Sequence, residues 1–410
     1  MFSRLSDLFT VVGPGLVTSF ADNDAGGVAT YSAAGAALGY QLLWVLLLST
    51  FALIVVQEIT VRIAVTTGKG LSDLIRESFG LRMTLLAMGV LFIANLGTTI
   101  SNFAGIAASM ELFSIPKIVS VPTCAFAIWL MVTRGSYRIV EKVLLSIALI
   151  LVAYVGAGIL SEPNWVEAWS GLFIPTISFT REHLFFAIAI VGTTITPWMQ
   201  FYLHSSIVEK GVHRRFLGTL RWELVIGAFL TNIIAFFIIV ACAATLHTQG
   251  VVITTAQEAA KALEPLAGEF AESLFGIGLL GASILGVFAV PLSTAYALSE
   301  AFGMENGVNK KVREAPFFYG LYFFILFVSV IFVLIPYIPL IPIMIFIEWM
   351  QGVLLPFVLF FMLRLANDQR LMGSARNSFW ANVVGGGTGV ALAVLSLLLV
   401  VGVAFGIFSF

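Results

Sequence analysis

The sequence predicts an all-α integral membrane protein with eleven transmembrane helices. Of its 410 residues, 60% are hydrophobic and 10% are charged, and the mean hydropathy is +1.03. A water-soluble fold carries about 25% charged residues, so this chain has too few of them to cover a surface in water. The apolar runs are also longer than the ~10-residue alternating strands of a membrane barrel. Helices of ~20 apolar residues are therefore expected to cross the bilayer.

Eleven apolar segments are predicted as spans. They cover residues 10–36 (interrupted), 40–66, 82–112, 118–133, 139–160, 182–207, 218–246, 270–302, 316–336, 339–364 and 379–409. The net charge of −1, without any basic run, disfavours nucleic acid as a partner. The two cysteines, Cys124 and Cys242, stand alone in apolar segments, so neither a disulfide framework nor a zinc site is expected.

Lysine and arginine positions predict the orientation of the chain. With residues 1–9 in the cytoplasm, 18 of the 21 basic side chains fall on the cytoplasmic side, where the loop 365–378 also lies. The positive-inside rule therefore predicts a multi-pass cell-membrane protein with its N-terminus inside and its final helix, within 379–410, ending outside. In the external segment 161–181, Trp165 and Trp169 predict a short helix at the membrane interface.

The first span is polar at its centre. Asp22 and Asp24 lie near the middle of the bilayer and are followed by Gly26 and Gly27. Ionisable groups at this depth are costly, and they mark substrate or ion pathways. The sequence therefore predicts a broken helix, where carboxylates and freed backbone carbonyls can coordinate a cation. The alternative is a kinked helix whose carboxylates are hydrogen-bonded to neighbouring helices.

The sixth span has a matching polar interruption. Gly192, Thr193, Thr194, Thr196 and Pro197 fall in its middle, and the proline removes a helical hydrogen bond. A simple proline kink, with threonine hydroxyls bonded to the preceding turn, is the competing interpretation.

The two interruptions together indicate an architecture. Each opens a set of five spans, 10–160 and 182–364, and sets of five have opposite orientations. Paired interrupted helices in inverted halves indicate a substrate site at the midplane. We therefore expect a 5+5 inverted repeat of the LeuT type, with one additional helix.

The tenth span contains a further polar pair. Glu348 and Gln351 lie three residues apart, on one helix face. They are candidates for lining the pathway, and a buried hydrogen bond between helices is the alternative. His204, alone near the end of the sixth span, is interpreted as a packing residue.

Several segments resemble the NRAMP divalent-metal transporters. GPGLVTSFADNDAGGVATYSAAGAALGYQLLWVLLLS is similar to the first span and second-span entry of that family, QEITVRIAVTTGKGLSDLIRESFG to its second loop, and GTTITP with YLHS to its sixth span. The resemblance extends over the first ten spans and is most specific in residues 13–80 and 190–206. It implies a membrane transporter of divalent cations.

The sequence departs from the family pattern at its metal ligands. Asp24 keeps the position of the family's aspartate, but Gly27 replaces its asparagine. Thr193 and Thr196 stand where the family has alanine and methionine, and Trp198 stands where it has histidine. The acidic positions of the family's proton route fall on Asn95, Thr99 and Asn102.

These departures favour a hard cation. Thioether sulfur favours transition metals, whereas oxygen ligands suit magnesium, which dehydrates reluctantly. The expected site contains Asp24, Asp22, Thr193 and Thr196, with space at Gly27 and further contacts from the Ala21 carbonyl and Gln200. The pattern resembles the NRAMP-related magnesium-transporter branch.

The first hypothesis is thus uptake of partly hydrated Mg²⁺, and also of Mn²⁺, by alternating access without proton coupling. A proton-coupled manganese or iron transporter and a sodium-coupled amino-acid transporter are the alternatives, and a membrane sensor is a fourth class. No enzyme activity, cofactor or obligatory protein partner is expected. The partners are the divalent cation and the lipid bilayer.

Overall fold

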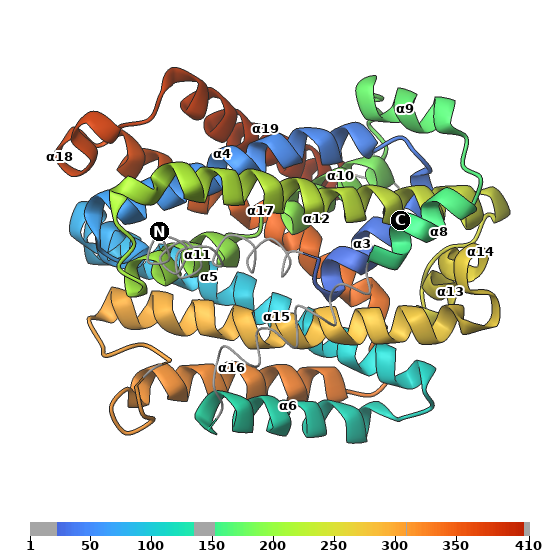
Figure 1. Cartoon of the computed structure of the whole chain (residues 1–410), viewed down its shortest axis with the longest axis horizontal. Coiled ribbons are helices and arrows are strands. Elements are labelled where there is room, and N and C mark those ends of the chain that lie inside the picture. The colour runs from blue at the N-terminus through green and yellow to red at the C-terminus, as the bar shows by residue number, and fades with distance from the viewer. Residues whose placement is uncertain (1–22, 135–151, 309, 406–410) are drawn as a thin grey trace, which may run out of the picture.

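The computed structural model describes residues 23–134, 152–308 and 310–405, and all regular elements in these ranges are helices. The helices of the bundle are α3 (Ala25–Leu38), α4 (Leu43–Thr67), α5 (Leu71–Leu112), α6 (Lys117–Arg134), α8 (Ala153–Leu160), α10 (Arg181–Thr194), α11 (Pro197–Glu209), α12 (Leu217–Thr245), α15 (Ala271–Phe302), α16 (Pro316–Leu334), α17 (Leu340–Asn367) and α19 (Phe379–Ala404). Several of them, among them α12, α15, α16 and α6, run roughly along the longest axis of the molecule, and others cross them obliquely (Figure 1).

The described helices match the predicted membrane spans closely. Eight helical segments in this part of the chain are long and apolar enough to cross a bilayer, and α6 is a shorter apolar helix. The predicted spans 10–36 and 139–160 begin outside the described residues, so α3 and α8 represent only their later parts. The count of eleven spans and the 5+5 repeat therefore stay predictions.

The third predicted span, 82–112, agrees with the second of two helical parts of α5. α5 begins at Leu71 and is interrupted at Gly80, whose φ of 75° lies in the left-handed region, so a separate helical part precedes the span. The first part contains Asp73, Arg76 and Glu77, which lower its hydropathy and conceal the helix from a search for apolar runs. A Cβ at Gly80 would meet nothing within 4 Å, so its backbone conformation explains the glycine.

Short helices lie at the two ends of the bundle (Figure 1). α9 (Trp165–Phe173), α13 (Ala256–Ala260) and α14 (Glu264–Ala267) share one end, and α18 (Gln369–Met372) lies at the other. The α9 helix confirms the short helix predicted in segment 161–181, and the rings of Trp165 and Trp169 are 6.4 Å apart. The predicted external segment 161–181 thus lies at the end opposite the predicted cytoplasmic loop 365–378.

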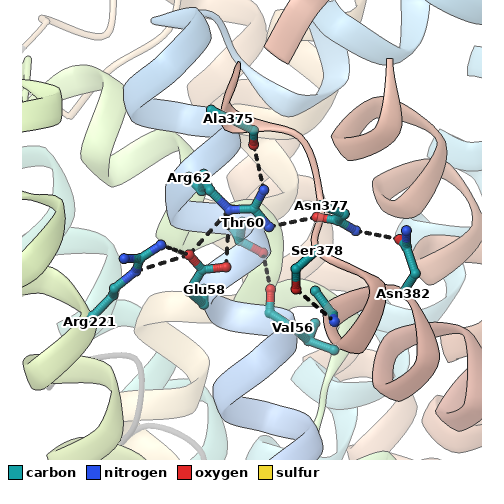
Figure 2. A network of polar contacts seen from close by, with 10 residues as sticks. Val56, Glu58, Thr60, Arg62, Arg221, Ala375, Asn377, Ser378 and Asn382 are labelled. Atoms are coloured by element: carbon teal, nitrogen blue, oxygen red, sulfur yellow. Dashed lines mark hydrogen bonds and ion pairs between the residues drawn. The ribbon is translucent and has the colours of Figure 1, made fainter. Parts of the chain in front are cut away.

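A polar network connects α4 with α12 and α19 near the α18 end (Figure 2). Arg62 forms an ion pair with Glu58 at 3.1 Å and donates to the Asn377 side chain at 2.6 Å. Arg221 from α12 contacts the same Glu58 carboxylate at 2.6 Å. Asn377 then donates to Asn382 in α19 at 2.8 Å. These contacts hold three helices together at this end of the bundle.

Candidate metal centre

Two helices begin at buried polar residues inside the bundle. Asp24 caps α3 and accepts a hydrogen bond from the Gly27 amide at 3.0 Å. α10 ends at Thr194, and α11 begins at Pro197 after the extended residue Thr196. The predicted interruption of the sixth span is therefore confirmed. Because helix N-termini stabilise negative charge, the start of α3 stabilises the Asp24 carboxylate.

A side chain of α5 fixes the orientation of the Asp24 carboxylate. Asn102 Nδ2 donates to Asp24 Oδ2 at 2.8 Å and to the Thr98 carbonyl at 2.9 Å. Its Oδ1 accepts from the Ala25 amide at 3.3 Å. Asn102 was expected only as a lost acidic position, so this positioning role was not predicted. Polar residues recur in this stretch of the span, at Asn95, Thr98 and Ser101, so Asn102 did not stand out in the sequence.

Glu348 of α17 lies directly against the start of α3. A Cβ added at Gly26 would collide with the Glu348 carboxylate and would lie 2.8 Å from Ser101 Oγ. Glu348 is fully buried, and its carboxylate interacts with the side chain of Thr193. Its carboxylate also interacts electrostatically with that of Asp24. The structure thus brings two buried carboxylates together from helices far apart in sequence.

Close packing of α10 on α17 determines where Glu348 lies. A Cβ at Gly192 would collide with the Glu348 carbonyl oxygen, and one at Gly352 would collide with the Ile188 carbonyl oxygen. Only glycine therefore allows the two backbones to approach this closely. The crossing brings the turn that contains Thr193 next to the Glu348 backbone.

The threonine hydroxyls of the interruption are available for further bonds. Thr193 and Thr196 are buried, and the Thr196 hydroxyl has no hydrogen-bond partner in the part of the chain that the structure describes. The Thr193 hydroxyl interacts with the Glu348 carboxylate, and its oxygen lone pairs can still accept further bonds. Thr194, by contrast, donates to the Ile190 carbonyl at 2.7 Å and contacts the Tyr31 hydroxyl at 3.0 Å. Thr193 and Thr196 thus present buried oxygens that can accept from a hydrated ion or coordinate it.

The remaining predicted site residues have other positions. Gln351 donates to the Ala94 carbonyl at 2.6 Å and to the Thr98 hydroxyl, so it forms the buried bond between helices that was the alternative prediction. Gln200 accepts from Thr60 of α4 at 2.9 Å. Gly27 contributes its backbone amide to the Asp24 cap. Asp22 and Ala21 lie outside the described residues.

Neither sulfur nor imidazole completes the centre. Within the described ranges, no group of three or more histidine, cysteine and acidic side chains is arranged to hold a metal ion. Met199, one turn into α11, accepts a hydrogen bond from Gln57 of α4 at 2.9 Å. His204 is fully buried, and its ring nitrogens have no hydrogen-bond partner among these residues. The side chains gathered around Asp24 therefore offer oxygen ligands.

The family is identified by a match that extends over nearly the whole sequence. Residues 15–402 match the family model described as "Natural resistance-associated macrophage protein-like", or Nramp. The chain belongs to the Nramp family. This result confirms the family resemblance noted in the sequence.

Individual relatives of this Nramp chain are named as transporters. The divalent metal cation transporter MntH of Klebsiella pneumoniae (strain 342) is 29% identical over 282 residues, covering 67% of this chain and 68% of its own length. A manganese transporter of Eremococcus coleocola has a TM-score of 0.77 at 19% identity, covering 97% of this chain and 88% of the other. These names agree with the expectation that the chain is not an enzyme.

The fold extends beyond metal transporters. MhsT, solved with L-phenylalanine, has a TM-score of 0.58 at 15% identity over 94% of this chain and 97% of its own. These neighbours are LeuT-type transporters, and the similarity confirms that fold class for this chain. At such identities the comparison concerns the fold alone.

Proposed function

We propose that this Nramp protein transports divalent cations by alternating access, with Mg²⁺ as its principal substrate and Mn²⁺ as a second one. The observation that supports this proposal is the pairing of Asp24 and Glu348, which are both buried and lie on helices far apart in the sequence. Two carboxylates together supply the charge that a divalent cation requires in a low-dielectric interior. The family and the names of its relatives support the same class of substrate.

The chemistry around this pair favours magnesium over softer metals. Thr193 and Thr196 add hydroxyl oxygens, and the sulfur of Met199 is engaged by Gln57. Magnesium prefers oxygen ligands and usually keeps several of its waters. Buried hydroxyls suit such waters, because each can accept a hydrogen bond from a coordinated water molecule.

Proton-coupled manganese transport is the second candidate, and the MntH and manganese-transporter relatives favour it. A proton route needs titratable groups that lead away from the metal. The α5 side chains Asn102, Thr98 and Ser101 lie next to the centre, and none of them titrates near neutral pH. A sodium-coupled amino-acid transporter fits less well, because the two carboxylates would repel the substrate's own carboxylate.

Restoring the family's ligands is expected to change the selectivity. Thr196→Met combined with Gly27→Asn adds a soft sulfur and an amide oxygen and reduces the space for bound water. We expect the ratio of magnesium to manganese uptake to fall by about tenfold, which corresponds to about 1.4 kcal/mol. Competition between the two ions in proteoliposomes measures this ratio. If the double variant is active and keeps the parent's ratio of magnesium to manganese uptake, residues other than these two determine the selectivity.

Transport is expected to be uncoupled from protons. The membrane potential alone contributes about 2.3 kcal/mol per charge per 100 mV, and a divalent cation carries two charges. Proteoliposomes that contain a pH-sensitive dye, an inside-negative potential and external magnesium provide the test. We expect magnesium entry without matching acidification. Internal acidification that scales with magnesium uptake, after correction for proton leak, would support the proton-coupled alternative.

A further inference from the structure

A large apolar groove lies away from the metal centre, between α5, α17 and α19. Its volume is 620 Å³, within the range of about 300–1,000 Å³ that is usual for ligand sites. Met83, Leu86, Phe357, Phe360, Ala393 and Leu397 are among its lining residues, and Ser396 is the one polar residue that lines it. In a membrane-spanning chain, such a groove faces lipid acyl chains.

The packing of α19 determines the depth at which the groove lies. A Cβ at Gly385 would lie 3.0 Å from Leu363, and one at Gly389 would lie 3.7 Å from Leu359. The two helices therefore run antiparallel, in contact along the last turns of α17. The groove opens past Ala393, between the second half of α19 and residues 353–361 of α17. Its walls thus begin about two turns inside the membrane end of α17.

Two arginines lie at the end of the groove nearest α18. Arg364 follows the lining residue Phe360 by one turn, and its Cζ lies 5.6 Å from that ring's centroid. Arg82 precedes the lining residue Leu86 by one turn on α5. The Phe79 ring lies 6.4 Å from that of Phe360, which shows that this part of α5 is beside α17. The two arginines are therefore at the same membrane level.

Neither arginine has an acidic partner in the described ranges. Both side chains are exposed, and neither Arg82 nor Arg364 forms an ion pair or a side-chain hydrogen bond within these ranges. Arg62 and Arg221, by contrast, both pair with Glu58. Two unpaired positive charges above an apolar groove complement a ligand that has a negative head and a hydrocarbon tail.

We propose that this groove is a binding site for an anionic phospholipid of the leaflet at the α18 end. One acyl chain fills the space between Phe357, Phe360 and Leu397, and Arg82 and Arg364 bind the headgroup phosphate. Arginine suits this role, because its planar guanidinium donates bidentate hydrogen bonds to phosphate. The predicted orientation puts the site in the cytoplasmic leaflet, where anionic lipids attract basic side chains.

Native mass spectrometry of the purified protein tests this proposal, with palmitoyl-oleoyl phosphatidylglycerol and the matching phosphatidylcholine as probes. We expect the parent protein to retain one phosphatidylglycerol in preference to phosphatidylcholine. Arg82→Gln with Arg364→Gln should weaken phosphatidylglycerol retention about thirtyfold, since two charged contacts are lost. Ala393→Phe should fill the groove and reduce retention of both lipids.

Arg313→Gln is the matched control, because Arg313 is also exposed but lies in the connection between α15 and α16. This variant should retain phosphatidylglycerol as the parent does. Equal retention of the two lipids by the parent would overturn the proposal, and so would undiminished phosphatidylglycerol binding by the double arginine variant. A dimer that dissociates on Ala393→Phe would also overturn it, by identifying a second copy of the chain as the occupant.

Discussion

Asp24→Ala is expected to reduce magnesium uptake in proteoliposomes by about a hundredfold or more. Asp24 supplies one of the two buried carboxylates at the centre, and it also caps α3 through the Gly27 amide. Removing one charged partner from a buried set typically costs several kcal/mol, and about 2.7 kcal/mol already corresponds to a hundredfold change. The cap is lost as well, which costs about 1 kcal/mol of folding stability.

Asp24→Asn tests the role of the Asp24 charge in transport separately from the role of Asp24 as a helix cap. Asparagine is as good a helix N-cap as aspartate, so the bond from the Gly27 amide can be kept. Its NH2 group cannot accept from Asn102, so this variant should fold with a somewhat lower thermal unfolding temperature and still lose transport. Glu111→Gln is the matched control, because Glu111 is an exposed carboxylate near the end of α5. It should transport at close to the parent rate. Near-normal uptake by a correctly inserted Asp24→Asn protein would show that Asp24 is not part of the metal site.

Gly26→Ala is expected to abolish uptake by displacing Glu348. The added Cβ would collide with the Glu348 carboxylate and lie 2.8 Å from Ser101 Oγ, both on neighbouring helices. Overpacking of this kind typically costs about 1–3 kcal/mol of stability. Adding Glu348→Ala removes the colliding carboxylate, so the double variant should recover stability without recovering transport. Thermal unfolding in detergent and uptake assays measure the two effects separately.

Gly89→Ala is the control for the helix propensity of alanine. Gly89 lies in α5, and a Cβ there would meet nothing within 4 Å. This substitution should leave uptake unchanged and add about 0.5–1 kcal/mol of stability, because alanine favours the helix. If Gly26→Ala transported like Gly89→Ala, the Glu348 carboxylate would not be in contact with the transported ion.

Local chemistry made the interruptions of the helices predictable from the sequence. Pro197 lacks a backbone donor and fixes its own φ, so α11 begins at this residue after a break. The spacing of Trp165 and Trp169 likewise identified α9. The charged part of α5 before Gly80 was not predicted, because hydropathy cannot distinguish a charged helix at the membrane edge from a loop.

The contacts that could not be predicted from the sequence join residues that are far apart along the chain. Asn102 bonds to Asp24 across 78 positions, and Gln351 reaches Ala94 across 257. Neither pairing follows from periodicity, since each depends on how α5 packs against α3 and α17. The sequence identified Glu348 as polar and deeply placed, but its contact with Gly26 required the three-dimensional packing.

The most direct test of this account is ion uptake by the purified protein in liposomes at a fixed inside-negative potential, with magnesium, manganese and calcium compared. The pairing of Asp24 and Glu348 with threonine hydroxyls predicts saturable magnesium entry, with manganese also transported. Entry should increase with the potential and disappear in the Asp24→Asn protein. Manganese uptake without magnesium uptake, in protein that is folded and correctly inserted, would contradict the account.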